Sequence, residues 1–200
     1  MRASFRKERF DQARLINIAN GLTALRVLLV PVVAYLLIAG RFRWALLVFS
    51  VCGVSDCLDG VLARWLHQRT VVGFYLDPVA DKLLIAMSFV VLAIVQVIPV
   101  WLTVLVISRD IFILAGSFLI LLLIGTEGIR VTAVSKANTA MQIATVLYFL
   151  SVRAFPGVLD RLAPGLEATA TEAVVIVCAV TTSLSGVQYL VAGIARLSRA

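Results

Sequence analysis

The stretch Ile111-Phe-Ile-Leu-Ala-Gly-Ser-Phe-Leu-Ile-Leu-Leu-Leu-Ile124 contains no charged residue. It is the second half of an apolar segment that begins at Pro99. A helix that crosses a bilayer requires about 20 consecutive, mostly apolar residues. The segment Pro99–Ile124 meets that requirement, and a soluble protein has no use for apolar sequence at this density. The segment therefore predicts a transmembrane helix.

The composition of the whole chain also indicates a membrane protein. Of its 200 residues, 62% are hydrophobic and 14% are charged, whereas soluble domains have about 45–50% apolar and about 25% charged residues. These proportions exclude a disordered chain, a collagen, a coiled coil and a soluble enzyme with a polar surface. The formal net charge of +7 is explained by basic residues at the cytoplasmic ends of membrane spans, so no nucleic-acid partner is expected.

Five further segments are long and apolar enough to span a membrane, although some of them contain acidic residues. The six predicted spans are Gly21–Ala39, Trp44–Leu66, Tyr75–Val97, Pro99–Ile124, Ala137–Val152 and Ala168–Ala195. Residues 1–15 mix basic side chains with phenylalanines, which favours an amphipathic helix lying in the membrane interface. We therefore expect an all-α integral membrane protein, with an interfacial amphipathic helix over residues 1–15 and six transmembrane helices within residues 16–200.

Lysine and arginine are distributed unevenly between the two sides of these spans. With a cytoplasmic N-terminus, the cytoplasmic segments hold eleven of them and the outer loops hold four, which are Arg41, Arg43, Arg153 and Arg161. Basic residues accumulate on the cytoplasmic side of membrane proteins. We therefore expect a multi-pass protein of a bacterial-type inner membrane, with both termini in the cytoplasm.

Two aspartates interrupt the second predicted span. Ionisable residues inside a membrane are costly and mark functional sites. On a helix with about 100° per residue, Asp56 and Asp59 share one arc of roughly 140° with Gly60, Ala63 and Arg64. One face of this helix therefore combines two acids, two very small side chains and an arginine that can bind a phosphate oxygen.

Two more aspartates lie in the third predicted span. Gly73, Asp77 and Asp81 are spaced by four residues and fall on one stripe of a helix. Because Pro78 suits a first helical turn, we expect Asp77 at the N-terminal end of this helix. About six polar residues connect the two spans, so we expect them to be antiparallel neighbours whose aspartates face one another.

Four carboxylates that share one site in a low dielectric need cations to stay ionised. Oxygen ligands alone indicate Mg²⁺, Mn²⁺ or Ca²⁺, and a pair of such ions is a common arrangement in phosphoryl transfer. The residues also leave other interpretations open. The acids can form the ion pathway of a divalent-cation transporter or a buried salt-bridge network with Arg64, Lys82 and Arg109, and glycines in spans can serve helix packing.

The run Asp56-Cys-Leu-Asp59-Gly60-Val-Leu-Ala63-Arg64, followed by Gly73, Asp77 and Asp81, resembles the signature of the CDP-alcohol phosphotransferases. All eight fixed positions are present at the spacing of that family. The stretch Asn17-Ile-Ala-Asn20-Gly-Leu-Thr23-Ala-Leu-Arg26 at the first span is also similar to the family, with Ala19 where a proline is common. The family has six spans and an interfacial N-terminal helix, in agreement with the prediction above.

The resemblance implies phospholipid biosynthesis by a transferase. The expected reaction moves the phosphatidyl group of CDP-diacylglycerol to an alcohol and releases CMP. Two divalent cations, Mg²⁺ or Mn²⁺, would be bound by Asp56, Asp59, Asp77 and Asp81, and Asp81 would also act as the catalytic general base. The CDP moiety would contact Asn20, Thr23, Asp56, Gly60, Ala63, Arg64 and Gly73. Residues 16–200 would then form the catalytic domain of a homodimer, with its active site on the cytoplasmic side.

Three basic residues in the second half of the chain are candidates for binding an anionic acceptor. They are Arg109, Arg130 and Lys136. Together they would provide a basic pocket for a phosphate group. In the alternative interpretation they pair with Asp110 and Glu127, or face lipid phosphates.

The sequence at the start of the fifth span bears on the acceptor. Phosphatidylglycerophosphate synthases of this family carry a Gly-Lys-x-Lys-Thr-type stretch where this chain reads Ser135-Lys136-Ala-Asn138-Thr139. The missing second lysine favours an acceptor with less charge, and the stretch is more similar to the cardiolipin synthases of the family. We therefore expect phosphatidylglycerol as the acceptor and cardiolipin as the product. Glycerol 3-phosphate as the acceptor, giving phosphatidylglycerophosphate, is the alternative.

Overall fold

The computed structural model describes residues 18–66, 71–124 and 133–197, with side chains over Leu25, 27–55, 82–116 and 134–193. These residues form only helices. The helices are α1 (Ile18–Ile38), α2 (Phe42–Leu66), α3 (Val71–Ile94), α4 (Val100–Ile124), α5 (Ala133–Ala154), α6 (Val158–Leu162) and α7 (Leu166–Leu197). The expectation of an all-α protein is therefore confirmed. Residues 1–15, for which an interfacial helix is predicted, lie outside the described residues.

Each of the six predicted spans corresponds to a long helix, and most of their bounds agree within about four residues. Among the described residues, one stretch, Leu166–Gly193, is long and apolar enough by itself to cross a membrane, and three shorter apolar helical stretches accompany it. The number of six spans remains a prediction. The short helix α6 was not expected, because its five residues are too few for a hydrophobic period to be recognised. Left-handed glycines at Gly157 and Gly165 delimit it.

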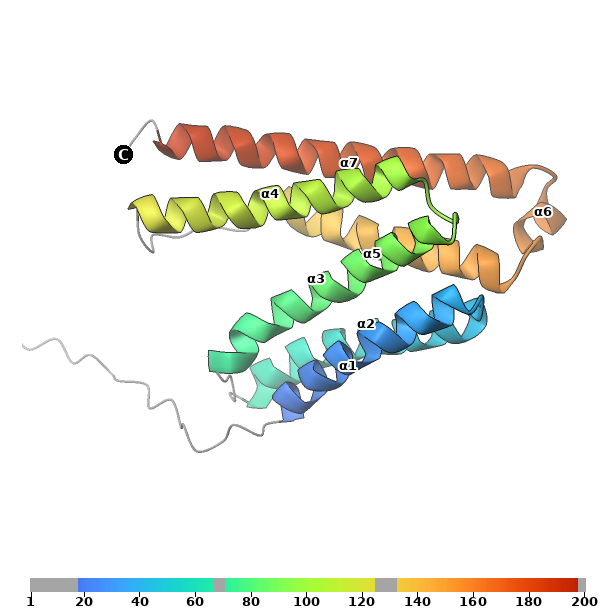
Figure 1. Cartoon of the computed structure of the whole chain (residues 1–200), viewed down its shortest axis with the longest axis horizontal. Helices are drawn as coiled ribbons and strands as arrows, with labels where there is room; N and C mark the ends of the chain where they lie inside the picture. The colour runs from blue at the N-terminus through green and yellow to red at the C-terminus, as the bar shows by residue number, and fades with distance from the viewer. Residues whose placement is uncertain (1–17, 67–70, 125–132, 198–200) are drawn as a thin grey trace, which may run out of the picture.

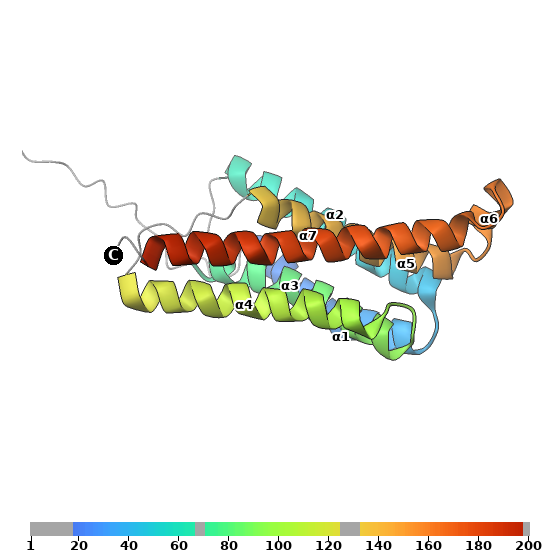
Figure 2. The ribbon, with the colours of Figure 1, turned by 90° about the horizontal axis from the view of Figure 1, so that it is seen from above.

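The long helices run alternately toward one end of the bundle and back (Figures 1 and 2). Helix α1 packs against α2 and α3, α5 packs against α2 and α7, and α4 packs against α7. Fully buried apolar side chains from several of these helices form the core, among them Leu37, Phe89, Leu92, Leu102 and Leu150. Close van der Waals packing of such side chains holds the helices side by side.

The structure corrects the predicted start of the third span. Helix α3 begins at Val71, and no acidic residue occupies its first turn. Asp77 therefore lies within the helix and not at its N-terminal end. The apolar residues from Val71 to Phe74 extend the helix by more than one turn before Pro78. Inside a helix, a proline removes one backbone hydrogen bond and crowds the preceding turn, and the packing of α3 against α1 and α4 compensates for this cost.

The outer surface of the bundle is strongly apolar. Large hydrophobic side chains are exposed on the long helices, including Leu28, Ile94, Val104 and Val191. Exposure of such a surface to water is unfavourable, whereas contact with the hydrocarbon of a bilayer is not. The long helices thus have the surface that a lipid-facing bundle requires.

Candidate active site

The four aspartates of the motif lie on two helices that meet at one end of the bundle. Asp56 and Asp59 belong to the C-terminal half of α2, and Asp77 and Asp81 belong to the N-terminal half of α3. Helix α2 runs toward this end and α3 runs away from it, as Figure 1 shows, so the expected antiparallel course is confirmed. We call the end of the bundle where α2 ends and α3 begins the aspartate end. The opposite end, where α6 lies, is called the far end.

The helical backbone supports the spacing argument made from the sequence. Helix α2 continues without a break to Leu66, so Asp56, Asp59 and Arg64 follow the helical period that places them on one face. Their side chains, like those of the α3 aspartates, lie outside the described ones. Among the side chains that are described, no group of three or more His, Cys, Asp or Glu residues is close enough to hold a metal ion. Metal binding by the aspartates therefore remains a prediction.

The residues predicted to contact CDP occupy the same helices. Asn20 and Thr23 lie in the first two turns of α1, which also begins at the aspartate end (Figure 1). Gly60, Ala63 and Arg64 lie on α2, and Gly73 lies on α3. The structure therefore brings the backbone of α1, α2 and α3 together at this end, while contacts of these side chains with a nucleotide stay predicted.

Arg109 is a buried arginine whose side chain has hydrogen-bond partners on several helices. It lies on α4, is only 6% exposed, and its Nη1 donates to Asp110 Oδ1 at 2.6 Å. Its Nη2 donates to Ser135 Oγ on α5 at 3.0 Å and to Ser185 Oγ on α7. The Nε donor is buried and has no hydrogen-bond partner among the side chains that the structure describes. One guanidinium therefore joins three helices and still offers a donor.

Asp110 connects this arginine to the helix that carries the α3 aspartates. Lys82 Nζ lies 3.0 Å from Asp110 Oδ1, the oxygen that Arg109 also contacts. Lys82 directly follows Asp81 in the sequence. Two cations share one carboxylate, so the local group retains a net positive charge. The pairing of Arg109 with Asp110, left open by the sequence, is present, and it still leaves positive charge beside α3.

The other two basic candidates, Lys136 and Arg130, have no described contact in this polar interior. Lys136 lies in the first turn of α5, next to Ser135 in the sequence, and its side chain is exposed. Arg130 lies outside the described residues. The structure therefore brings Arg109 into the polar interior and leaves Lys136 at the surface near the start of α5.

Two amide side chains continue the polar interior along α5. Asn138 is fully buried, and its Oδ1 accepts a hydrogen bond from Thr182 Oγ1 on α7 at 3.0 Å. Gln142 is buried one turn further on. Asn138 Nδ2 and Gln142 Nε2 have no hydrogen-bond partner among the described residues. A buried donor without a partner costs about 1–3 kcal/mol, so these groups are suited to meeting an oxygen atom of water or of a ligand.

Sequence reasoning missed the contribution of α7 to this interior. Ser185 contacts Arg109. Thr182, three residues before Ser185, contacts Asn138. Cys178 lies against Thr145 and Thr182, a further turn away. The spacing of Cys178, Thr182 and Ser185 by four and three residues puts small polar side chains on one face of an apolar helix. That stripe is the signal that could have identified them.

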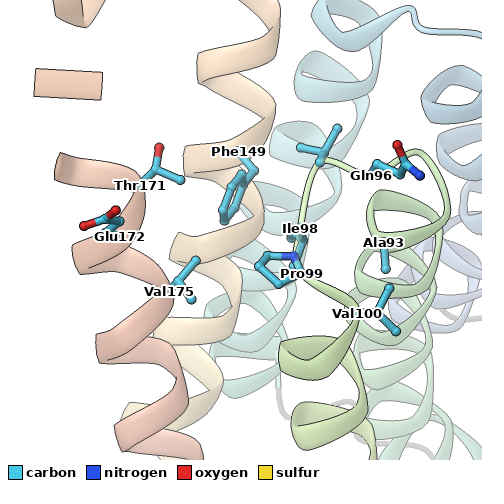
Figure 3. Close-up of a pocket in the computed structure, with 10 residues that line it drawn as sticks. Ala93, Gln96, Ile98, Pro99, Val100, Phe149, Thr171, Glu172 and Val175 are labelled. Atoms are coloured by element: carbon cyan, nitrogen blue, oxygen red, sulfur yellow. The ribbon is translucent and has the colours of Figure 1, made fainter. Parts of the chain in front are cut away.

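Described residues also line a pocket of about 460 Å³ at the far end. Figure 3 shows Ile98 and Pro99 from the turn before α4, Phe149 from α5, and Thr171 and Glu172 from α7 around it. Most of its lining is apolar, and its single charged group is a carboxylate. Such a lining does not suit a nucleotide or a phosphate, so this pocket is not part of the active site.

Comparison with known proteins identifies the family. The model of the CDP-alcohol phosphatidyltransferase family matches residues 16–184. The cardiolipin synthase (CMP-forming) of Homo sapiens is 38% identical over 155 residues, which cover 70% of this chain and 52% of that protein. The cardiolipin synthase (CMP-forming) of Streptomyces coelicolor is 36% identical over 119 residues, covering 56% of this chain and 55% of that protein.

A relative with another name matches a shorter part of the chain. The probable phosphatidylglycerophosphate synthase of Mycobacterium tuberculosis is 36% identical over 107 residues, or 50% of each chain. The chain thus spans about half the length of the curated relatives it matches. The family model covers most of the sequence, including all four aspartates and Arg109. This chain belongs to the CDP-alcohol phosphatidyltransferase family.

Proposed function

We propose that the protein transfers the phosphatidyl group of CDP-diacylglycerol to the hydroxyl of phosphatidylglycerol, giving cardiolipin and CMP. The observation that carries this proposal is the complete aspartate motif on two antiparallel helices of a chain that belongs to this family. Its similarity to cardiolipin synthases of human and Streptomyces origin supports the choice of acceptor. Membership of this family disfavours the alternative of a divalent-cation transporter.

In the proposed reaction, Asp81 accepts the proton of the acceptor hydroxyl. The hydroxyl oxygen forms a bond to the phosphorus that carries diacylglycerol, and the bond from that phosphorus to the CMP oxygen breaks with its electron pair. A positioned general base contributes roughly 10²–10⁴-fold to the rate of such a step. Asp81 directly precedes Lys82 in the sequence, and the side chain of Lys82 pairs with Asp110.

The donor set on α2 and α3 fits hard divalent cations, because all four candidate ligands are carboxylates. Asp56, Asp59, Asp77 and Asp81 would hold two ions, Mg²⁺ or Mn²⁺. When bound, these ions neutralise the diphosphate and stabilise the negative charge of the departing CMP. Asn20, Thr23, Gly60, Ala63, Arg64 and Gly73 would position the CDP moiety, with small side chains leaving room for it to approach the helices.

Arg109 is the proposed anchor for the acceptor phosphate. Its buried Nε has no partner within the described part of the chain, and the group it forms with Lys82 and Asp110 keeps a positive charge. The unpartnered donors of Asn138 and Gln142 extend the same interior along α5. Phosphatidylglycerol carries one phosphodiester charge, and a single buried guanidinium with neutral amide donors suits that charge. Lys136, exposed in the first turn of α5, would add positive charge for the acceptor, and Arg130 is a further candidate from the sequence.

The apolar surface and the alternating course of the helices support a multi-pass membrane protein with six spans. The distribution of arginines and lysines supports cytoplasmic termini, and an active site that opens to the cytoplasm would release CMP there. Residues 1–15 would lie as a helix in the interface, and residues 16–200 would form the catalytic domain, assembled as a homodimer in a bacterial-type inner membrane.

The test is an acceptor competition with the purified protein. CDP-diacylglycerol is supplied with equal concentrations of phosphatidylglycerol and glycerol 3-phosphate, CMP release is measured, and the lipid products are identified by mass spectrometry. Inositol phosphate and serine serve as parallel acceptors. Cardiolipin as the dominant product is expected. Phosphatidylglycerophosphate as the dominant product would establish the second candidate, which the similarity to the Mycobacterium tuberculosis relative favours.

A further inference from the structure

Three arginines converge on a pocket at the far end of the bundle. Arg41, Arg43 and Arg153 line a space of about 420 Å³ together with Trp44. Arg41 and Arg43 come from the junction of α1 and α2, and Arg153 comes from the last turn of α5. These two segments are more than one hundred positions apart in the sequence, and both lie at the far end in Figures 1 and 2. The pocket is thus separate from the aspartate end.

The backbone and one side-chain contact shape this pocket. Gly40 adopts a left-handed conformation with φ of 69°, which brings the amide of Arg41 to Leu36 O at 2.8 Å and places α2 directly after α1. Arg43 Nε donates to Ala154 O at the end of α5 at 3.0 Å, and its guanidinium lies 5.6 Å from the centroid of Phe155. All three arginines are exposed at the pocket, and the hydrogen bond to Ala154 holds Arg43 in place.

No described carboxylate pairs with the three arginines of this pocket. Two acids of the far end are engaged elsewhere, because Asp160 Oδ1 accepts from the Glu167 amide at 3.0 Å and Glu167 Oε2 accepts from the Gly157 amide at 3.3 Å. The planar guanidinium of one arginine can donate two parallel hydrogen bonds to two oxygens of one phosphate. The pocket therefore suits a phosphate group.

An apolar track leads away from the pocket along α2. Trp44, Leu47, Val51 and Val54 follow one another at helical spacing and are between 52% and 60% exposed. Tryptophan is enriched where a protein crosses the membrane interface. A soluble phosphate compound would use the arginines alone, whereas a phospholipid would also cover this apolar track with an acyl chain. The combination favours a lipid.

We propose that Arg41, Arg43 and Arg153 bind the phosphate of an anionic phospholipid in the leaflet at the far end, with an acyl chain along Trp44 to Val54. The site rests on the membrane placement given above but is independent of the catalytic reaction. It differs from the other far-end pocket, whose lining carries Glu172 and no arginine. Four basic residues are predicted on the outer side, and this site gives three of them a function.

The test compares lipid binding to the purified full chain by native mass spectrometry. The probe is phosphatidic acid, which has no alcohol to serve as an acceptor. The double variant R41Q/R153Q removes two arginines whose side chains make no hydrogen bond or ion pair with another described residue, and R161Q removes one exposed charge of α6 at the same end. Because charged hydrogen bonds to phosphate are strong, we expect R41Q/R153Q to weaken the apparent Kd about tenfold or more. R161Q should bind as the unmodified protein does.

Two further arms identify the ligand. Phosphatidylcholine should bind more weakly than phosphatidic acid, and millimolar inorganic phosphate should not displace the lipid. Equal binding by R41Q/R153Q and R161Q would overturn the proposal, and displacement by inorganic phosphate would show a site for free anions. Turnover of CDP-diacylglycerol is measured on the same samples. A protein without turnover would contradict the proposed function, yet the comparison of lipid binding would still decide on this site.

Discussion

Lys82 Nζ on α3 lies 3.0 Å from Asp110 Oδ1 on α4, and Arg109 Nη1 contacts the same oxygen at 2.6 Å. One carboxylate thus connects the residue after Asp81 with the arginine that also binds α5 and α7. Arg109 has a side chain that is only 4% exposed, whereas Asp110 is 16% and Lys82 33% exposed. The carboxylate therefore compensates mainly the buried guanidinium, and Lys82 completes the group from a position nearer the surface.

Replacing this carboxylate should destabilise the protein. In the variant Asp110→Asn, the buried Arg109 loses its charged partner and Lys82 loses its ion pair. Removing one partner of a buried pair leaves a charge uncompensated, and hydrogen bonds to charged groups are worth about 1.5–3 kcal/mol. A clear fall in the thermal unfolding midpoint in detergent is expected. Glu172→Gln, which changes an exposed carboxylate of α7, serves as the control and should leave the midpoint unchanged.

Substituting Arg109 by lysine separates its charge from its geometry. A lysine keeps the positive charge, but its three donors sit on one nitrogen. It therefore cannot reproduce the planar fork that reaches Asp110 through Nη1 and both Ser135 and Ser185 through Nη2. The KM for the acceptor should rise about tenfold, while the KM for CDP-diacylglycerol changes much less. Steady-state kinetics with each substrate varied in turn measures both. Equal increases of both constants would argue against a role of Arg109 in acceptor binding, and Arg161→Lys provides the control.

The predicted metal site has a distinct kinetic signature. EDTA should abolish CMP release, and Mg²⁺ or Mn²⁺ should restore it. Asp56→Asn, Asp59→Asn and Asp77→Asn should each raise the metal concentration needed for half-maximal rate, because each removes an anionic ligand. Full activity of the metal-stripped protein would contradict the site.

Asp81 should differ from the other aspartates, because it is the proposed base. Asp81→Asn should lower kcat by 10²-fold or more while CDP-diacylglycerol still binds, as measured by equilibrium binding of the nucleotide lipid. A variant with near-normal kcat would exclude the general-base role. Loss of nucleotide-lipid binding together with kcat would instead assign Asp81 to the metal site alone.

The sequence predicted the long helices because each one carries a long apolar run, of the length expected for a helix that spans a membrane. Helix α4 illustrates this, since its predicted and observed bounds differ by one residue at the N-terminus. The start of α3 was placed too late, because a proline within a helix resembles a helix start when only local sequence is considered. The contacts of Arg109 could not be predicted, since they join residues up to 76 positions apart. Spacing along one helix carries no information about which helix packs against it.

The unpartnered amide of Gln142 gives a prediction in which stability and activity change in opposite ways. Methionine has nearly the same shape, so Gln142→Met removes the buried Nε2 donor without opening a cavity. Because that donor has no partner among the described residues, the unfolding midpoint should stay unchanged or rise. If Nε2 meets an oxygen of the acceptor, the KM for phosphatidylglycerol should increase several-fold at the same time.

Ser88→Ala is the matched control, because Ser88 is buried and its Oγ donates within its own helix to Leu84 O at 2.8 Å. An unchanged KM in Gln142→Met with a normal midpoint would restrict the acceptor site to Arg109 and the helix ends, and a fall in the midpoint would indicate that Nε2 is satisfied by a structural water.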